Sequence, residues 1–300
     1  MAAEPSGAAI VAEYRRGVNV ALQSLCDGPE IAALGAVGEA IRYSILGEGK
    51  RWRPVLLMAS HDAAGGDGDV SALAAATEVV HAYSLVHDDL PCMDDDDIRR
   101  GRPTTHCVYG VATAAVAGAA MVPLAAAVAA NAARALGLPW PVCGAIVREL
   151  MRASGAGGMV GGQLLDLRGE GQSPTLAELE VIHRAKTGAL IAAAVRIGAM
   201  AAGADERRLS ALARFGDAVG LAFQIADDIL DATGSTGQLG KTAGRDAELG
   251  KSTYVAHVGV DGARAHGMRL IDHACDALQQ AGVRTPALEY LARSTLTRAS

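Results

Sequence analysis

The sequence predicts an all-α protein, and three observations support this fold class. Apolar residues recur at helical spacing along nearly the whole chain. The segments between Gly- and Pro-rich breaks are rich in Ala and Leu, which are good helix formers. No run alternates between apolar and polar residues over six or more positions, as a half-buried strand would.

The expected helices follow one another with short breaks. They cover roughly 9–26, 31–46, 54–64, 70–96, 108–136, 141–154, 175–202, 206–232, 252–282 and 285–297. Several look apolar on every side, which is typical of helices enclosed by others. Half of the 300 residues are apolar, so the chain can bury a large core. No Pro/Ser-rich linker divides it, and we expect residues 1–300 to form one domain.

Composition and charge exclude several classes of protein. The net charge of −6 argues against a nucleic-acid partner. The five cysteines are scattered without a CxxC pair, which indicates buried thiols in a reducing cytosol rather than disulfides or zinc. The N-terminal MAAEPSGAAIVAEYRR lacks a basic region followed by a long apolar run, so it does not resemble a signal peptide. We expect a cytoplasmic protein.

The segment VATAAVAGAAMVPLAAAVAA (111–130) is uncharged and long enough to cross a bilayer. Its residues are mostly Ala and Gly, however, with few of the large apolar side chains that drive insertion. We therefore expect a buried helix of a soluble protein and no stable membrane insertion.

The segment LVHDDLPCMDDDDIRRGRP (85–103) places six aspartates within ten positions beside apolar sequence. In an unbroken helix, Asp88 and Asp94 would point about 120° apart, and Asp95 would be the better partner for Asp88. Pro91 breaks or kinks that helix. Asp88 and Asp94 could then both reach a metal at the helix end, where the dipole also favours cations.

A second segment, FQIADDILD (223–231), also embeds carboxylates in apolar helical sequence. Asp227 and Asp231 lie four residues apart and share a helical face. One acidic run is more often a solvated surface, but two runs in apolar sequence require a common counter-charge. Carboxylate pairs suit Mg²⁺, which shares its ligands with substrate phosphates. An EF-hand fits poorly, because 94–105 lacks its glycine and closing glutamate.

Cationic residues complement the acids in four places. They occur in GEGKRWRP (47–54), in the RR pair after the first acidic run, in HRAKTGAL (183–190) and in LGKTAGRDAELGK (239–251). Each alone is more typical of a soluble surface, but beside two acidic clusters they indicate phosphate binding. The segment GSTGQLGKT (234–242) is not a Walker A loop, because its glycines stand one residue too far apart and it follows a helix.

Together the motifs GKRWRP, DDLPCMD, KTGAL and FQIADDILD…GKTAGRD resemble those of the trans-isoprenyl diphosphate synthases. Their order and spacing match from about Gly47 to Lys251, over two-thirds of the chain. The resemblance implies an isoprenoid synthase fold with roughly ten helices around a central cavity, and a homodimer. It implies a prenyltransferase that joins isopentenyl diphosphate head-to-tail to an allylic diphosphate, dimethylallyl or geranyl. The expected cofactor is Mg²⁺, about three ions, which Mn²⁺ could replace.

The metal ligands follow from the resemblance motif by motif. Asp88 and Asp94 correspond to ligands of the first acidic motif, with Asp89 supporting, and the choice of Asp94 over Asp95 rests on the resemblance alone. Asp227 corresponds to the principal ligand of the second motif. Its neighbours Asp228 and Asp231 correspond to direct or water-mediated ligands.

The resemblance also assigns the substrate contacts. The residues expected to hold isopentenyl diphosphate are Lys50, Arg53, His81 and Arg100. Those expected to grip the allylic diphosphate are Arg99, Lys186 and Lys241. The expected catalytic residues are Lys186, Thr187, Gln224 and Lys241, of which Thr187 and Gln224 lie beside the reacting carbon. Asp96 and Asp97 are expected to orient Arg99 and Arg100.

This residue set suits ionisation of a C–O bond. Cations stabilise the charge that develops on the leaving diphosphate, which is usually the dominant catalytic effect. The allylic cation then meets the isopentenyl double bond, because both diphosphates are anchored close together. The departing diphosphate is the expected base for the final proton loss. An apolar cavity protects the cation from water.

Product length depends on the cavity floor. Tyr83 lies five residues before Asp88, about 7.5 Å deeper along the helix. A ring there, with the two-residue insertion in DDLPCMD, resembles farnesyl (C15) diphosphate synthases of bacterial type. Ordinary core packing is the alternative role for Tyr83. Ala119, Ala120 and their Ala-rich neighbours leave room, so geranylgeranyl (C20) diphosphate is the alternative product.

Two positions depart from the family pattern. Val111 and Ala119 stand where the family usually has acids that do not bind the metal directly. The change is expected to loosen the order around the metal ligands or to alter activity. A catalytically weak regulatory subunit of a hetero-oligomeric synthase is therefore an alternative of another class. A terpene cyclase is disfavoured, because GKRWRP and His81 indicate a second diphosphate site.

Overall fold

The computed structural model describes residues 5–169, 171–233 and 252–297. Its N-terminal helices are α1 (Gly7–Cys26), α2 (Pro29–Ala32), α3 (Ala36–Ile45), α4 (Trp52–Ala63) and α5 (Ser71–Asp88). Then follow β1 (Ile98–Arg99), β2 (Arg102–Pro103), α6 (Thr105–Tyr109), α7 (Val111–Ala135), α8 (Trp140–Ser154) and α9 (Met159–Gly169). The remainder is α10 (Leu176–His183), the π-helix η1 (Arg184–Gly188), α11 (Ala189–Ala201), α12 (Glu206–Thr233), α15 (Tyr254–Ala281) and α16 (Pro286–Thr297). The all-α prediction is confirmed.

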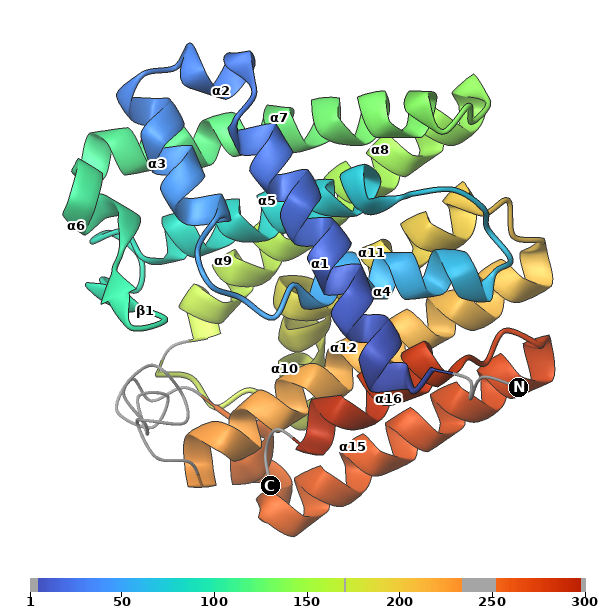
Figure 1. The fold of residues 1–300 in the computed structure, drawn as a ribbon. Coiled ribbons are helices and arrows are strands. Elements are labelled where there is room, and N and C mark those ends of the chain that lie inside the picture. The colour runs from blue at the N-terminus through green and yellow to red at the C-terminus, as the bar shows by residue number, and fades with distance from the viewer. Residues whose placement is uncertain (1–4, 170, 234–251, 298–300) are drawn as a thin grey trace.

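Two apolar clusters form the core. Figure 1 shows α7 along one edge of the molecule and α15 along the opposite edge, with α4, α5, α11 and α12 between them. One cluster joins α1, α3, α5, α7 and α8, and the other joins α12, α15 and α16. Helix α4 contributes to both, since Leu57 packs in the first cluster and Leu56 in the second. The two clusters are therefore bound to each other through a shared helix.

Several helix ends follow from local sequence. Ser6 caps α1 by accepting a hydrogen bond from the Ala9 N–H, and Thr175 forms a capping box with Glu178 at α10. Gly110, at φ 83°, separates α6 from α7 within the expected 108–136 helix. The expected 31–46 helix is likewise two helices, α2 and α3.

The expected 70–96 helix ends early, and a hairpin follows it. Helix α5 stops at Asp88, and 91–94 form a turn that contains Pro91. β1 and β2 then pair antiparallel through a two-residue turn of Arg100 and Gly101, both at positive φ. Strands of two residues each leave no alternating pattern, so the sequence could not predict them.

The expected 175–202 helix is partly wrong, and so is the absence of an expected helix between 154 and 175. The helix is three pieces, α10, η1 and α11, because five residues adopt π-helical backbone. The Gly-rich stretch there runs into a further helix, α9. α9 packs against η1, so both errors fall at one place in the fold.

Helix α7 is only partly buried, contrary to expectation. By length and composition, α7 and α12 could each cross a membrane. The most apolar window is 56% buried inside the protein for α12, but only 28% buried for α7. The apolar residues of α7 therefore leave one face of the helix uncovered.

Candidate active site

The first acidic segment wraps around the end of α5. The Asp94 N–H donates to the Asp88 carbonyl oxygen at 2.8 Å, which closes the turn that contains Pro91. Asp88 and Asp94 are therefore neighbours across the turn, at the negative end of the α5 dipole. Asp95 adopts left-handed backbone, at φ 51°. The turn brings the backbones of Asp88 and Asp94 together, and their role as ligands of one metal stays a prediction.

Burial disfavours the ionised forms of Asp88 and Asp89. It raises the pKa of Asp88 to about 6, an effect that Lys186 and Arg99 oppose and Asp94 reinforces. Burial also raises the pKa of Asp89 to about 6, although its carboxylate accepts a 2.5 Å hydrogen bond from Arg99. Such a cluster favours a bound cation.

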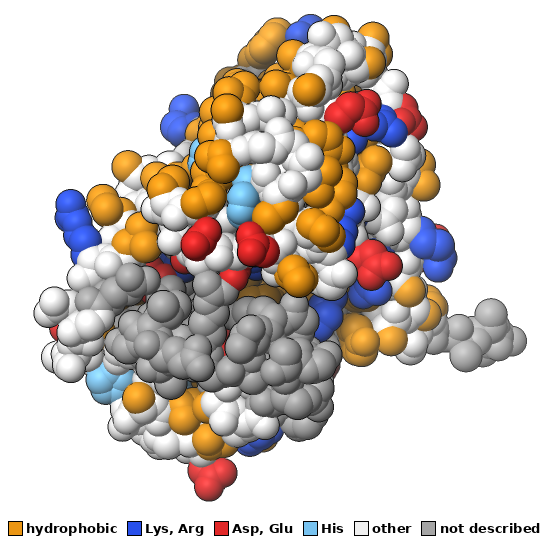
Figure 2. All heavy atoms as spheres, turned by 90° about the vertical axis from the view of Figure 1, so that its left-hand side faces the viewer, with side chains coloured by type: hydrophobic (Ala, Val, Ile, Leu, Met, Phe, Trp, Pro, Cys, Tyr) orange, Lys and Arg blue, Asp and Glu red, His pale blue; other side chains and the backbone are white. Residues whose placement is uncertain are grey.

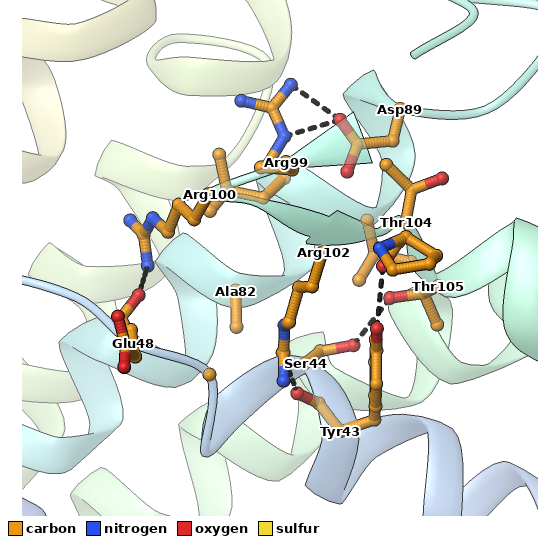
Figure 3. Close-up of a pocket in the computed structure, with 14 residues that line it drawn as sticks. Tyr43, Ser44, Glu48, Ala82, Asp89, Arg99, Arg100, Arg102, Thr104 and Thr105 are labelled. Atoms are coloured by element: carbon orange, nitrogen blue, oxygen red, sulfur yellow. Dashed lines mark hydrogen bonds and ion pairs between the residues drawn. The ribbon is translucent and has the colours of Figure 1, made fainter. Parts of the chain in front are cut away.

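The hairpin carries the two arginines beside this turn (Figure 3). Arg99 pairs with Asp89 at 2.5 Å and with Asp96 at 3.3 Å, as predicted for Asp96. Arg100 donates instead to the Glu48 carbonyl oxygen at 2.7 Å. The predicted role of Asp97 in orienting Arg100 is wrong, because the carboxylate of Asp97 contacts Cys107 at 3.2 Å.

A small pocket lies between this hairpin and α3 (Figure 3). Arg102 stacks on the Tyr43 ring, 3.9 Å from its centroid, and the Tyr43 hydroxyl donates to the Pro103 carbonyl oxygen at 2.7 Å. Arg99 and Arg100 line the same pocket. Its three guanidinium groups outnumber the two carboxylates that line it, Glu48 and Asp89.

His81, on α5, faces the cations of this region. Its Nε2 lies 3.4 Å from Arg100 Nη2, and its buried Nδ1 has no hydrogen-bond partner among the described residues. Burial, with the charges of Arg53 and Arg100, lowers the pKa of His81 well below its usual value. A neutral ring can accept from Arg100 at Nε2, which leaves the buried Nδ1–H as a donor without a protein partner among the described residues.

In GKRWRP, Arg51 is more deeply buried than Lys50 and Arg53, the two residues expected to bind diphosphate. Lys50 is exposed and Arg53 is partly buried at the start of α4. Arg51 is buried, at φ 51°, and its guanidinium pairs with Glu78 at 2.8 Å and donates to the Gly47 carbonyl oxygen at 2.7 Å. Arg51 therefore fixes the loop that presents its neighbours.

The second acidic cluster lies near the end of α12. Asp228 accepts hydrogen bonds from the Tyr254 N–H at 2.6 Å and from Gln224 Nε2 at 3.4 Å, and it lies 3.2 Å from His183 Nε2. These protein contacts make Asp228 a group that holds α12 to α10 and α15. Asp231 differs, because its buried Oδ1 has no hydrogen-bond partner among the described residues. Asp227 is partly buried on the same helix.

The π-helix η1 joins the two clusters. Thr187 Oγ1 donates to Gln224 Oε1 on α12 at 2.8 Å, and the Lys186 charge lowers the pKa of Asp88 on α5. Single π-helical turns often mark functional sites. The structure thus brings together four of the predicted residues, Asp88, Lys186, Thr187 and Gln224.

Helix α9 adds two residues that the sequence analysis missed. Asp166 accepts from Lys186 Nζ at 2.6 Å. Gln163 is buried, and neither of its amide atoms has a partner among the described residues. Gly162 allows this approach, because a Cβ there would lie 2.2 Å from the Lys186 backbone nitrogen. The three-residue spacing of Gln163 and Asp166, which places both side chains on one face of a helix, was the signal from which the sequence could have predicted them.

Tyr83 lies on α5 one turn from His87. Their rings meet edge to face with centroids 4.8 Å apart, and His87 Nε2 lies 3.2 Å from the Ala115 carbonyl oxygen on α7. Tyr83 is partly buried against the first core cluster. Lys241, the remaining predicted residue, lies outside the described residues.

Figure 2 shows acidic side chains gathered near the middle of the face that Figure 1 presents at its left, the side on which the β1 hairpin lies. Carboxylates from two helices, a lysine between them and arginines on the adjoining hairpin form one polar region. This arrangement is suited to binding highly charged anions together with divalent cations.

Comparisons with known proteins agree with this geometry. The chain is 47% identical to farnesyl diphosphate synthase of Escherichia coli (strain K12), over 87% of this chain and 89% of that protein. It is 45% identical to geranylgeranyl pyrophosphate synthase 9 of Arabidopsis thaliana, over 76% and 64%. The fold matches a geranyltransferase from Helicobacter pylori solved with magnesium and isoprenyl diphosphate, with TM-score 0.80 and 28% identity, over 99% and 98%.

The sequence model of the polyprenyl synthetase family matches residues 35–287. This range contains both acidic clusters, η1 and the hairpin arginines. The chain is therefore a prenyltransferase that belongs to the polyprenyl synthetase family.

Proposed function

We propose that this chain, acting as one catalytic domain, condenses isopentenyl diphosphate with dimethylallyl and then geranyl diphosphate to give (E,E)-farnesyl diphosphate. The observation that carries the proposal is η1, where Lys186 lies within electrostatic reach of Asp88 and Thr187 contacts Gln224. The similarity to the Escherichia coli farnesyl diphosphate synthase supports the product.

The acidic residues fit Mg²⁺ as the cofactor. Burial raises the pKa values of Asp88 and Asp89 more than the neighbouring cations lower them, and Asp231 has a buried carboxylate oxygen without a partner among the described residues. We propose that Asp88, Asp94, Asp227 and Asp231 would hold about three Mg²⁺ ions, which Mn²⁺ could replace. The neighbour from Helicobacter pylori, solved with magnesium, supports this choice. Bound Mg²⁺ would stabilise charge on the leaving diphosphate.

The protein's own side chains would anchor the two diphosphates on either side of the reacting carbons. Lys50, Arg53, His81 and Arg100 would hold isopentenyl diphosphate, with the unpartnered His81 Nδ1–H as a neutral donor. Arg99, Lys186 and Lys241 would grip the allylic diphosphate. Both anchors together keep the allylic carbon close to the isopentenyl double bond.

Thr187 and Gln224 would act on the carbocation. Thr187 Oγ1 already donates its proton to Gln224 Oε1, so the hydroxyl oxygen lone pairs are left to face a developing cation. A fixed dipole of this kind stabilises the cation without adding a nucleophile that could capture it. The departing diphosphate would then accept the proton that restores a double bond.

The proposed reaction is tested by incubating the purified chain with labelled isopentenyl diphosphate and each allylic primer in turn, with and without Mg²⁺. We expect Mg²⁺-dependent turnover and a dominant C15 product. No turnover by the chain alone would favour the regulatory-subunit alternative instead. A dominant C20 product would contradict the farnesyl assignment.

The C20 alternative rests on the similarity to geranylgeranyl pyrophosphate synthase 9 of Arabidopsis thaliana and on the small residues of α7. One of these residues no longer supports it. Ala119 is exposed, so its small size does not widen a cavity inside the protein, whereas Ala120 packs against the first core cluster. The farnesyl product therefore remains the better supported of the two.

Mg²⁺ binding should strengthen as pH rises through about 6. Burial raises the pKa of Asp88 and Asp89 above the ordinary value of 3.8, so the protonated forms favour folding. That stabilisation is fully present below about pH 4 and is lost as pH rises through about 6. Mg²⁺ binds the ionised forms, so its effect on the melting temperature should be larger at about pH 7.5 than at about pH 5. An Asp88→Asn variant should show a smaller pH dependence, and an unchanged one would contradict this origin.

We propose that the protein is a cytoplasmic homodimer, and the exposed face of α7 supports this state. Its exposed residues recur at helical spacing, as Ala112, Val116, Ala119, Pro123 and Ala127. Val116 is 54% exposed and Val111, at the start of the helix, is 49% exposed. Both departures from the family pattern, Val111 and Ala119, thus extend an apolar surface. An uncharged face of this length is typical of an interface between subunits.

Replacing Val116 with glutamate should convert the dimer into monomers. Two charges would be buried near the symmetry axis, where neither has a cationic partner on α7. Sedimentation velocity or light scattering would measure the change in mass, with Val20→Glu as control. Val20 is 70% exposed on α1, a helix that does not belong to the proposed face, and its substitution should leave the mass unchanged. A wild-type monomer would overturn the proposed dimer.

A further inference from the structure

Among the described residues, three metal-type ligands converge beside the β1–β2 hairpin. Asp97 immediately precedes β1, while His106 and Cys107 lie on α6. Cys107 Sγ lies 3.2 Å from Asp97 Oδ1 and 3.5 Å from His106 Nε2, and the remaining distance, between His106 Nε2 and Asp97 Oδ1, is 3.8 Å. All three ligand atoms therefore lie within 3.8 Å of one another.

These spacings match the edges of a tetrahedral metal site. Bonds of about 2.0–2.3 Å from Zn²⁺ to nitrogen, oxygen and sulfur place the ligand atoms about 3.4–3.6 Å apart. The three measured distances bracket that range, so a cation could enter with small side-chain movements. The side chain of Asp97 is 81% exposed and Cys107 is also exposed, which leaves a path for entry.

A neighbouring threonine orients the ligands. Thr104 Oγ1 lies 3.1 Å from His106 Nδ1 and donates to Cys107 Sγ at 3.3 Å. When Nδ1 carries the proton and donates it to Thr104, the lone pair of Nε2 points to the cluster. The Thr104 N–H also donates to the Asp97 carbonyl oxygen at 2.9 Å, which ties the acid to the start of α6. The buried imidazole is thus held in the orientation that a metal ligand needs.

We propose that Asp97, His106 and Cys107 form a second metal site, which takes Zn²⁺ or another thiophilic divalent cation with water in the fourth position. Sulfur and nitrogen donors select such ions against Mg²⁺, which prefers oxygen. Binding displaces the Cys107 thiol proton to solvent. The ion would cross-link the two segments that flank the hairpin, and the hairpin carries Arg99 and Arg100.

Cobalt provides a direct test, because thiolate-bound Co²⁺ absorbs in the near ultraviolet and tetrahedral Co²⁺ has intense visible bands. The full chain is titrated with Co²⁺ in saturating Mg²⁺, which occupies carboxylate sites. We expect both absorptions at one ion per chain, loss of the charge-transfer band in Cys107→Ser, and its retention in Cys92→Ser. Cys92 is the matched control, since it is exposed in the neighbouring acidic segment and lies outside the cluster. No charge-transfer band in the wild-type protein, or one that survives Cys107→Ser, would overturn the site.

Thiol alkylation gives a second readout within one molecule. Zn²⁺ in the presence of Mg²⁺ should slow iodoacetamide modification of Cys107 at least tenfold, while Cys92 continues to react, as measured by peptide mass spectrometry. Equal protection of both thiols would mean that Zn²⁺ acts elsewhere, and no protection of Cys107 would mean that it does not bind there. Both serine variants should retain wild-type Mg²⁺-dependent turnover and helical content.

Discussion

Replacing Lys186 with alanine should lower Mg²⁺-dependent turnover about 10²–10³-fold, the loss that follows removal of one group stabilising transition-state charge. Lys186 is held at 2.6 Å by Asp166 and lowers the pKa of Asp88, so its ammonium lies between the acidic segment and α9. From there it can meet the leaving diphosphate. The melting temperature should fall modestly, because the Lys186–Asp166 pair is partly buried, with side chains 27% and 22% exposed.

Arg184 provides the control from the same π-helix. Its side chain is 46% exposed and pairs with Glu180 at 3.5 Å, one turn away on α10. Arg184→Ala removes an equal charge from η1 without touching Asp166, and its turnover should stay near that of the wild-type protein. A Lys186→Ala enzyme as active as Arg184→Ala would show that the position of the charge does not matter. Single-turnover rates would separate a loss in chemistry from a loss in binding.

The sequence predicted those parts of the site that depend only on residues close to one another in the chain. Asp227 and Asp231 share a face because they are four residues apart, and Pro91 ends the helix that carries Asp88 because it cannot continue the hydrogen-bond ladder. Each of these inferences needs only the neighbouring turn. The all-α fold is predicted for the same reason, since helical periodicity is a local property.

The parts that the sequence could not predict depend on distant segments. Asp228 looks equivalent to Asp227 in the motif, yet it accepts a hydrogen bond from the Tyr254 N–H, 26 residues away, and lies 3.2 Å from His183 Nε2, 45 residues away. The sequence did not predict helix α9, because glycine is a poor helix former. In the fold, however, Gly162 is needed for close contact with Lys186. Tertiary packing overrides local preference at both places.

Truncating Tyr83 to alanine should shift the main product from C15 to C20 or longer. The Tyr83 ring packs edge to face on His87, and His87 is fixed in turn by its contact with the Ala115 carbonyl oxygen on α7. Gly118 permits that contact, because a Cβ there would lie 2.3 Å from the His87 ring. A growing chain that starts at the acidic motif and runs along α5 would meet this braced ring one to two turns below Asp88.

The comparison of Tyr83→Ala with Tyr83→Phe decides whether ring bulk sets the length. Phenylalanine keeps the ring and its packing on His87 but removes the hydroxyl, so this variant should still release C15. Longer products from Tyr83→Phe would assign the effect to the hydroxyl instead. Truncating the ring leaves a cavity large enough to admit another isoprene unit, so a longer product is expected if Tyr83 is the floor. If Tyr83→Ala still releases only the C15 product, Tyr83 is an ordinary core residue. Product chromatography with geranyl diphosphate as primer distinguishes these outcomes, because each added unit lengthens the chain by five carbons.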